Sequence, residues 1–172
     1  MSDSDGPARP TEREAAIVAA QLGRVPREPW RIAARCSYGF STVIVSPALL
    51  DDATPFPNFA WLTCPHLAET LSAEESAGAA ARWAERAQSD QQLAAALAAT
   101  HASVREARAA ESGGVDACAS VGLAGQRDPL GVKCLHAHVA LVLAGIADPI
   151  GTEELGKIER VCSDARCMAL MT

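Results

Sequence analysis

The sequence has few aromatic residues and no long hydrophobic run. Aromatic side chains make up 4% of the 172 residues, although hydrophobic residues as a whole make up 49%. The longest apolar stretch, residues 132–146, is interrupted by Lys133, His136 and His138. It falls short of the ~18 apolar residues that a membrane-spanning helix needs. We therefore expect no membrane span, and a core of small aliphatic side chains, which suits closely packed helices.

An excess of basic residues is also missing. The chain carries 15 Lys and Arg against 21 Asp and Glu, which gives a formal net charge of −6. Proteins that bind nucleic acids neutralise phosphates with clustered Lys and Arg, and anionic membrane surfaces attract the same kind of cluster. We therefore expect no nucleic-acid partner and no membrane partner, and the sequence identifies no particular small-molecule or protein partner.

The first residues lack the basic and apolar stretches of a secretory signal peptide. Residues 1–11 are polar and acidic, and we expect a disordered tail there, followed by a single α+β domain over residues 12–172. A cytoplasmic location is expected, where cysteines are reduced thiols or metal ligands rather than disulfides. The six cysteines are Cys36, Cys64, Cys118, Cys134, Cys162 and Cys167.

The N-terminal half of the chain predicts a helix and then a small sheet. Thr11 and Glu14 form a capping-box pattern for a helix that Gly23 ends. Between about residues 30 and 63, β-branched runs separated by turn residues indicate a small antiparallel β hairpin or sheet. Its clearest strand is Ser41–Val45.

The rest of the chain is predicted to be mainly helical. Residues 65–111 are expected to form two or three helices, because capping-box patterns begin at Ser72 and Ser89. Asp128 precedes a proline, as an N-cap residue often does, which predicts a helix from there to about Ala144. The predicted fold class is therefore α+β, with the small sheet packed on a helical remainder.

Three cysteines and one histidine are the candidate metal ligands. Cys134 and His138 are four residues apart in the expected helix, so they would lie on one of its faces. Cys36 follows the first expected strand, and Cys64 lies where the third strand passes into a helix. Together they form the Cys₃His set that holds zinc tetrahedrally. The three thiolates alone would instead hold a [4Fe–4S] cluster with one open iron.

Buried cysteines without a metal fit the same sequence. Cysteine is among the most buried residue types and packs as a small hydrophobe. Cys162 and Cys167 form a C-x₄-C pair, which is looser than the C-x₂-C spacing typical of zinc sites, and Cys118 has no partner pattern. Three hypotheses therefore stay open: an enzyme with an open metal position, a non-catalytic structural or interaction module with a closed zinc site, and a metal-free protein with buried or redox-reactive thiols.

Several segments together resemble one bacterial family. They are R-C-S-Y-G at 35–39, T-P-F-P at 54–57, W-L-T-C-P at 61–65 and G-V-K-C-L-H-A-H at 131–138. On these segments the sequence resembles the bacterial domain of unknown function 501 family, over about residues 20–152. The resemblance implies no reaction. It places five candidate residues inside segments that the family shares, namely Cys36, Cys64, Cys134, His136 and His138.

Overall fold

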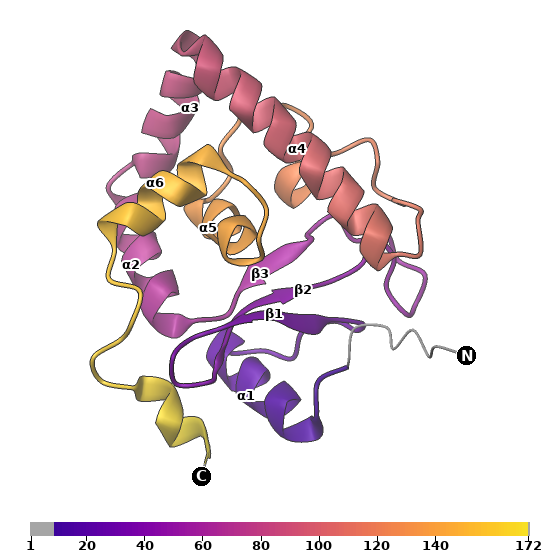
Figure 1. The fold of residues 1–172 in the computed structure, drawn as a ribbon, viewed down its shortest axis with the longest axis vertical. Coiled ribbons are helices and arrows are strands. Elements are labelled where there is room, and N and C mark those ends of the chain that lie inside the picture. The colour runs from indigo at the N-terminus through magenta and orange to yellow at the C-terminus, as the bar shows by residue number, and fades with distance from the viewer. Residues whose placement is uncertain (1–8, 172) are drawn as a thin grey trace.

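The protein is an α+β molecule with a three-stranded sheet and a mainly helical C-terminal part (Figure 1). The computed structural model describes residues 9–171, so residues 1–8 of the predicted disordered tail lie outside the described part. The elements are α1 Glu12–Leu22, β1 Arg31–Arg35, β2 Ser41–Val45, β3 Ala60–Leu62, α2 Pro65–Ser76, α3 Ala79–Ser89, α4 Gln91–Glu111, α5 Leu135–Leu143 and α6 Pro149–Lys157, with short 3₁₀ helices η1 Leu123–Gly125 and η2 Arg166–Met171. The predicted fold class is confirmed.

The strands form one antiparallel sheet in the order β1–β2–β3. All five residues of the central strand β2 are buried, because both faces of the sheet are covered. On one face, Ile44 packs with Val18 of α1 and with Trp30. On the other face, Val43 and Val45 belong to the larger core formed with the helices.

Local signals define α1 as the sequence predicts. The Thr11 side chain accepts the N–H of Glu14, and the Glu14 carboxylate accepts the backbone N–H of Thr11. Gly23 ends the helix in the left-handed conformation, with φ of 69°, which glycine adopts at little cost.

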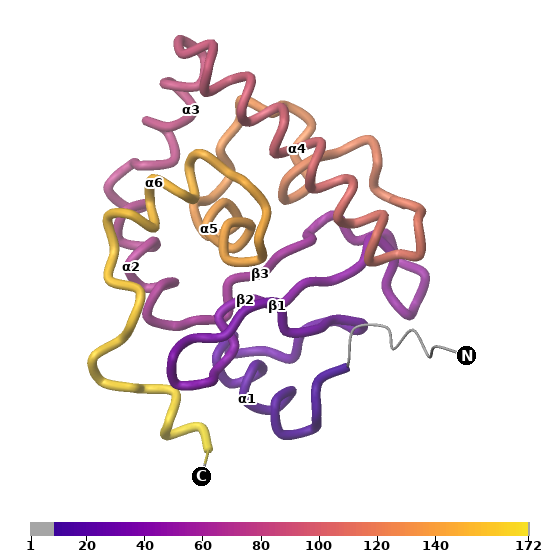
Figure 2. The backbone as a smooth tube through the Cα atoms, viewed as in Figure 1, coloured from indigo at the N-terminus to yellow at the C-terminus, as the bar shows by residue number. Residues whose placement is uncertain are grey.

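Helix α5 lies at the centre of the helical part. It is seen end-on in Figure 2, with α2, α4 and the sheet around it, and it contacts α6, β3 and α2. Leu135, Val139 and Leu141 are almost completely buried, as expected for a helix made mainly of apolar residues. None of the helices in residues 9–171 is long and apolar enough to cross a membrane.

Residues 65–111 form three helices, but they do not begin where the capping patterns suggest. Ser72 lies inside α2, and the chain turns at Gly78, whose φ of 85° is left-handed. The next helix begins after Asp90 rather than Ser89, because the Asp90 carboxylate accepts two N–H groups of the first turn of α4. The N-cap residue is therefore the aspartate one position further along, which is as favourable there as serine.

The predicted helix start at Asp128 is wrong. The Asp128 carboxylate accepts the N–H of Leu130, and its carbonyl accepts the N–H of Gly131. These bonds close a local turn, which competes with helix formation. Helix α5 begins only at Leu135, and Cys134 is its N-cap residue, with extended φ and ψ of −160° and 146°.

Candidate functional site

The structure does not bring the four predicted ligands together. Cys36 and Cys64 line one small cavity, while Cys134 lines another. His138 is buried within the core. Among residues 9–171, no three of these side chains have ligand atoms within 4.8 Å of one another. The i, i+4 argument for Cys134 and His138 does not apply, because Cys134 precedes the helix with extended backbone.

His138 has a well-defined structural partner instead. Its Nδ1 lies 2.8 Å from Oδ2 of Asp148, and the two side chains are 1% and 0% exposed. Asp148 is also the N-cap residue of α6, where its Oδ1 accepts the N–H of Gly151 at 2.6 Å. The pair therefore links α5 to the start of α6, and the His138 ring takes part in the packing of these two helices.

A different group has the geometry of a metal site. Glu75, Cys134 and His136 each offer a ligand atom, and these atoms all lie within 4.8 Å of one another. Glu75 lies near the end of α2, Cys134 precedes α5, and His136 is the second residue of α5. The His136 and Glu75 side chains are 28% and 25% exposed, so the group lies at the surface of the core and is open to solvent.

Hydrogen bonds fix the orientation of the His136 ring. Its Nε2 lies 3.1 Å from the carbonyl oxygen of Ala68, which can only accept, so Nε2 carries a proton. Its Nδ1 lies 3.0 Å from Oε1 of Glu75. Nδ1 is therefore the ring nitrogen through which His136 could share a cation with Glu75. A ligand histidine whose other ring N–H donates to a backbone carbonyl is the usual arrangement in metal sites.

The Cys134 thiol lies in surroundings that oppose its ionisation. Burial raises its pKa, the backbone N–H groups of Ala137 and His136 lower it, and the nearby Glu75 carboxylate raises it. Burial is the largest of these effects, so the free thiol keeps its proton at neutral pH. Because a metal ion would replace that proton, binding at this cysteine depends on pH.

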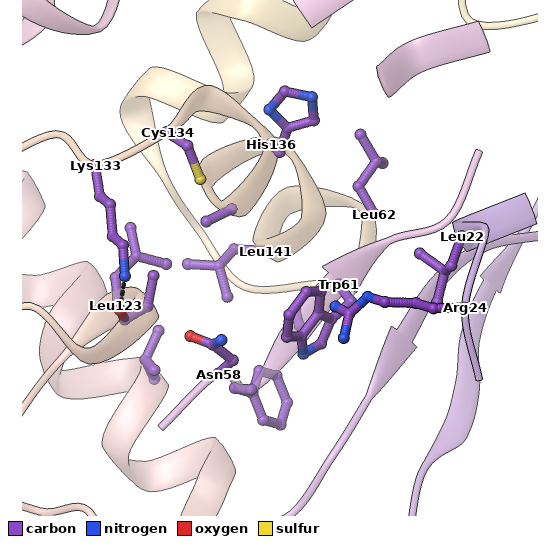
Figure 3. A pocket seen from close by; sticks show the side chains of 15 residues that line it. Leu22, Arg24, Asn58, Trp61, Leu62, Leu123, Lys133, Cys134, His136 and Leu141 are labelled. Atoms are coloured by element: carbon purple, nitrogen blue, oxygen red, sulfur yellow. Dashed lines mark hydrogen bonds between the residues drawn. The ribbon is translucent and has the colours of Figure 1, made fainter. Parts of the chain in front are cut away.

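Cys134 and His136 also line a cavity of about 490 Å³ beside β3 and α5 (Figure 3). Its walls are mainly apolar, and two cationic side chains reach it. The Arg24 guanidinium carbon lies 4.6 Å from the centroid of the Trp61 ring, and Lys133 donates to the carbonyl oxygen of Ala124. An apolar cavity with a few polar groups suits a small molecule, and here one that carries a negative group.

The fold and this group define a small α+β protein with sulfur, nitrogen and oxygen donors beside an apolar cavity. The chain belongs to the DUF501 family, described as a protein of unknown function, whose model matches residues 32–155 and therefore more than half of the chain. The match confirms the resemblance found in the sequence. No curated protein and no solved structure matches the chain.

Sequence reasoning missed Glu75 and preferred His138 to His136. Glu75 had a signal, but its place in an S-x-x-E pattern suggested a helix cap. On a continuous helix, His136 would point away from Cys134. The extended backbone at Cys134 removes that constraint, which brings the two side chains together.

Proposed function

We propose that the protein binds one zinc ion through Cys134, His136 and Glu75. The observation that carries this proposal is the closeness of the three ligand atoms, all within 4.8 Å of one another. Thiolate, imidazole and carboxylate are the three protein donors that zinc prefers. The group contains a single cysteine, whereas a [4Fe–4S] cluster needs several thiolates, so the donors favour zinc over the iron–sulfur alternative.

Three protein donors leave the fourth position of a zinc tetrahedron open. An open position distinguishes catalytic zinc sites from structural ones, in which protein donors fill all four. A zinc ion held by these residues would lie beside the apolar cavity, because Cys134 and His136 line that cavity. The proposed function is therefore a zinc-dependent enzyme that acts on a small molecule, with Arg24 and Lys133 attracting a negatively charged group of the substrate.

A cytoplasmic location belongs to this proposal, because a reducing compartment keeps Cys134 available as a metal ligand. The main competing hypothesis is a metal-free role for the group. Glu75 Oε1 accepts the backbone N–H of Leu135 as well as facing His136. A carboxylate and a histidine that merely join α2 to α5 would account for these contacts.

Metal analysis of freshly purified, untagged protein distinguishes these hypotheses. We expect Cys134→Ser and His136→Ala each to lower the zinc content by one ion per chain. The matched controls are Cys118→Ser and His66→Ala, since His66 is the second residue of α2 as His136 is of α5. Unchanged zinc content in both site variants would refute the proposal. A brown colour in protein purified without oxygen would instead indicate an iron–sulfur cluster.

A further inference from the structure

Four cysteines outside the Glu75 group line one small cavity. They are Cys36, Cys64, Cys162 and Cys167. Cys36 follows β1, and Cys64 is the N-cap residue of α2. Cys162 and Cys167 lie beyond α6. In Figure 1 the C-terminal segment runs back past α2 to lie near α1, and η2 contacts α1. All four are free thiols.

Two of the four thiols, Cys64 and Cys167, have raised pKa values to which neighbouring cysteines contribute. Burial raises the pKa of Cys64, and the nearby Cys167 and Cys162 raise it further. Burial also raises the pKa of Cys167; a hydrogen bond from Gln21 opposes this rise, and Cys162 and Cys36 add to it. The Gln21 amide nitrogen lies 3.4 Å from the Cys167 sulfur, so one sulfur already has an N–H donor of the kind that orients metal ligands.

The size of the cavity limits what the four sulfurs can hold. Its volume is about 10 Å³, roughly the space of one water molecule. A single metal ion fits such a space, whereas a cluster of four irons and four sulfides does not. Four thiolates are the donor set of structural zinc sites.

We propose that Cys36, Cys64, Cys162 and Cys167 form a structural zinc site that holds the C-terminal segment against β1 and α2. This site is separate from the proposed Glu75 group and shares no ligand with it. When zinc binds, each coordinated thiol releases its proton to solvent. No oxidant or reductant is involved, and the four sulfurs complete the tetrahedron, so the site is closed.

Binding draws the sulfurs closer together. Within residues 9–171, no three of these sulfurs lie within 4.8 Å of one another, whereas tetrahedral Zn–S bonds of about 2.3 Å place them roughly 3.8 Å apart. Cys162 lies outside any helix or strand, where the Tyr38 hydroxyl donates to its carbonyl oxygen at 3.2 Å. Backbone outside regular secondary structure can adjust without breaking a helix or strand, so zinc binding tightens the C-terminal segment.

The test uses the full chain, stripped of metal with a chelator, kept reduced and titrated with Zn²⁺ alone. Trypsin cleaves after arginine, and Arg160 and Arg166 lie in the C-terminal segment. We expect zinc to slow cleavage at these two residues by at least about tenfold, because the bound ion favours the closed segment. Titration with Co²⁺ should also produce thiolate-to-cobalt absorption that Cys162→Ser weakens.

Matched variants separate this site from the Glu75 group. Cys162→Ser and Cys36→Ser, at two partly exposed positions, should each lower the zinc content by one ion and abolish the protection from trypsin. Cys134→Ser and Cys118→Ser should leave that protection intact. The proposal is overturned if Cys162→Ser keeps the zinc content and the protection of the wild type. A disulfide between any two of the four in freshly purified protein would overturn it as well.

Discussion

Oε1 of Glu75 lies 3.0 Å from Nδ1 of His136 and also accepts the backbone N–H of Leu135. One carboxylate oxygen therefore joins the last turn of α2 to the first turn of α5. It also lies beside the one nitrogen of His136 that does not face a carbonyl. These contacts give Glu75 a structural role, which mutation can separate from its proposed role as a metal ligand.

Glu75→Gln should weaken zinc binding without unfolding the protein. The amide oxygen can still accept the Leu135 N–H, but it carries no charge for the metal. We expect the zinc Kd to rise at least about tenfold, and the unfolding free energy of the zinc-free protein to change by less than about 1 kcal/mol. Competition with a coloured chelator measures the zinc Kd, and urea unfolding measures the free energy of unfolding. Glu74→Gln, at the exposed neighbouring position, is the control, and equal affinities of the two variants would contradict the prediction.

His138→Asn should have the opposite pattern, with stability lost and metal retained. The change removes an imidazole that is 1% exposed and bonded to the buried Asp148 carboxylate. A lost hydrogen bond to a charged group lowers the free energy of unfolding by about 1.5–3 kcal/mol. Urea unfolding and zinc analysis of the same preparation test this. Loss of zinc from a variant of wild-type stability would return His138 to the metal site, as the sequence suggested.

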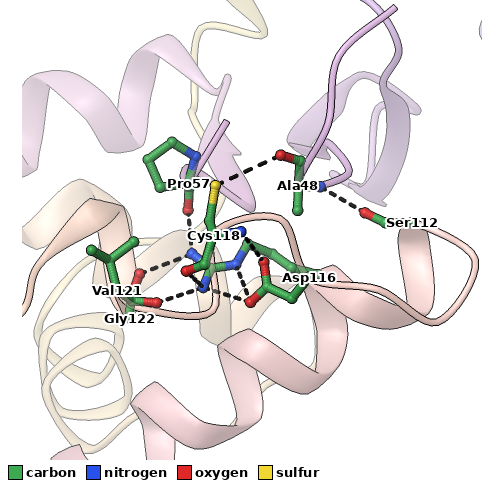
Figure 4. A network of polar contacts seen from close by, with 8 residues as sticks. Ala48, Pro57, Ser112, Asp116, Cys118, Val121 and Gly122 are labelled. Atoms are coloured by element: carbon green, nitrogen blue, oxygen red, sulfur yellow. Dashed lines mark hydrogen bonds and ion pairs between the residues drawn. The ribbon is translucent and has the colours of Figure 1, made fainter. Parts of the chain in front are cut away.

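Arg108 holds the loop after α4 in place, and its replacement should be severely destabilising. Its side chain is 0% exposed and pairs with Asp116 at 2.9 Å. The guanidinium also donates to the carbonyl oxygens of Pro57, Cys118, Val121 and Gly122. These four residues lie close together in Figure 4. Arg108→Met leaves the Asp116 charge buried and unpaired, for which we expect a loss of about 3–5 kcal/mol in unfolding free energy. Arg105→Met, at a partly buried position of the same helix, is the control and should change the unfolding free energy by less than about 1 kcal/mol.

His101 should make the protein less stable in mild acid. Burial lowers its pKa below the ordinary value of 6.5; the charges of His138 and Arg105 lower it further, while Asp148 and Asp128 oppose the shift. Between the folded and unfolded pKa values, the unfolded chain binds a proton that the folded chain does not. Stability from this residue is therefore fully present above about pH 6.5 and falls with decreasing pH below it, by up to about 1.4 kcal/mol per pH unit.

Urea unfolding at a series of pH values between 5 and 8 measures this effect. In His101→Gln the free energy of unfolding should fall less steeply below pH 6.5, because the side chain no longer titrates. This holds whatever the stability of the variant at pH 8. An unchanged pH dependence in the variant would show that other groups cause the acid sensitivity.

The parts of the fold that the sequence predicted are those set by local contacts. Thr11 and Gly23 define α1 through bonds that span at most a few residues. The candidate site depends on distant contacts: Glu75 and Cys134 are far apart in the chain and meet only because α2 packs against α5. The spacing of residues in the sequence does not predict a tertiary contact of this kind. The error at Asp128 has another cause, since its carboxylate closes a local turn as readily as it caps a helix.

Close packing between α5 and α6 provides the last prediction. A Cβ on Gly151 would lie 2.2 Å from the carbonyl oxygen of His138 and 2.6 Å from its carbonyl carbon. These are backbone atoms of a buried helix, so a methyl group there must push α5 and α6 apart. Gly156 lies in the same helix, and a Cβ there would meet nothing within 4 Å.

The same substitution at these two glycines should therefore have effects of opposite sign. Gly151→Ala should lower the unfolding free energy by about 1–3 kcal/mol through overpacking. Gly156→Ala should raise it by about 0.5–1 kcal/mol, because alanine loses less backbone entropy than glycine on entering a helix. Urea unfolding of both variants at pH 8 measures the difference. Because Cys134 is the N-cap residue of the displaced α5, Gly151→Ala should also weaken zinc binding, whereas Gly156→Ala should not. Stabilisation by both substitutions would show that α5 and α6 do not pack this closely.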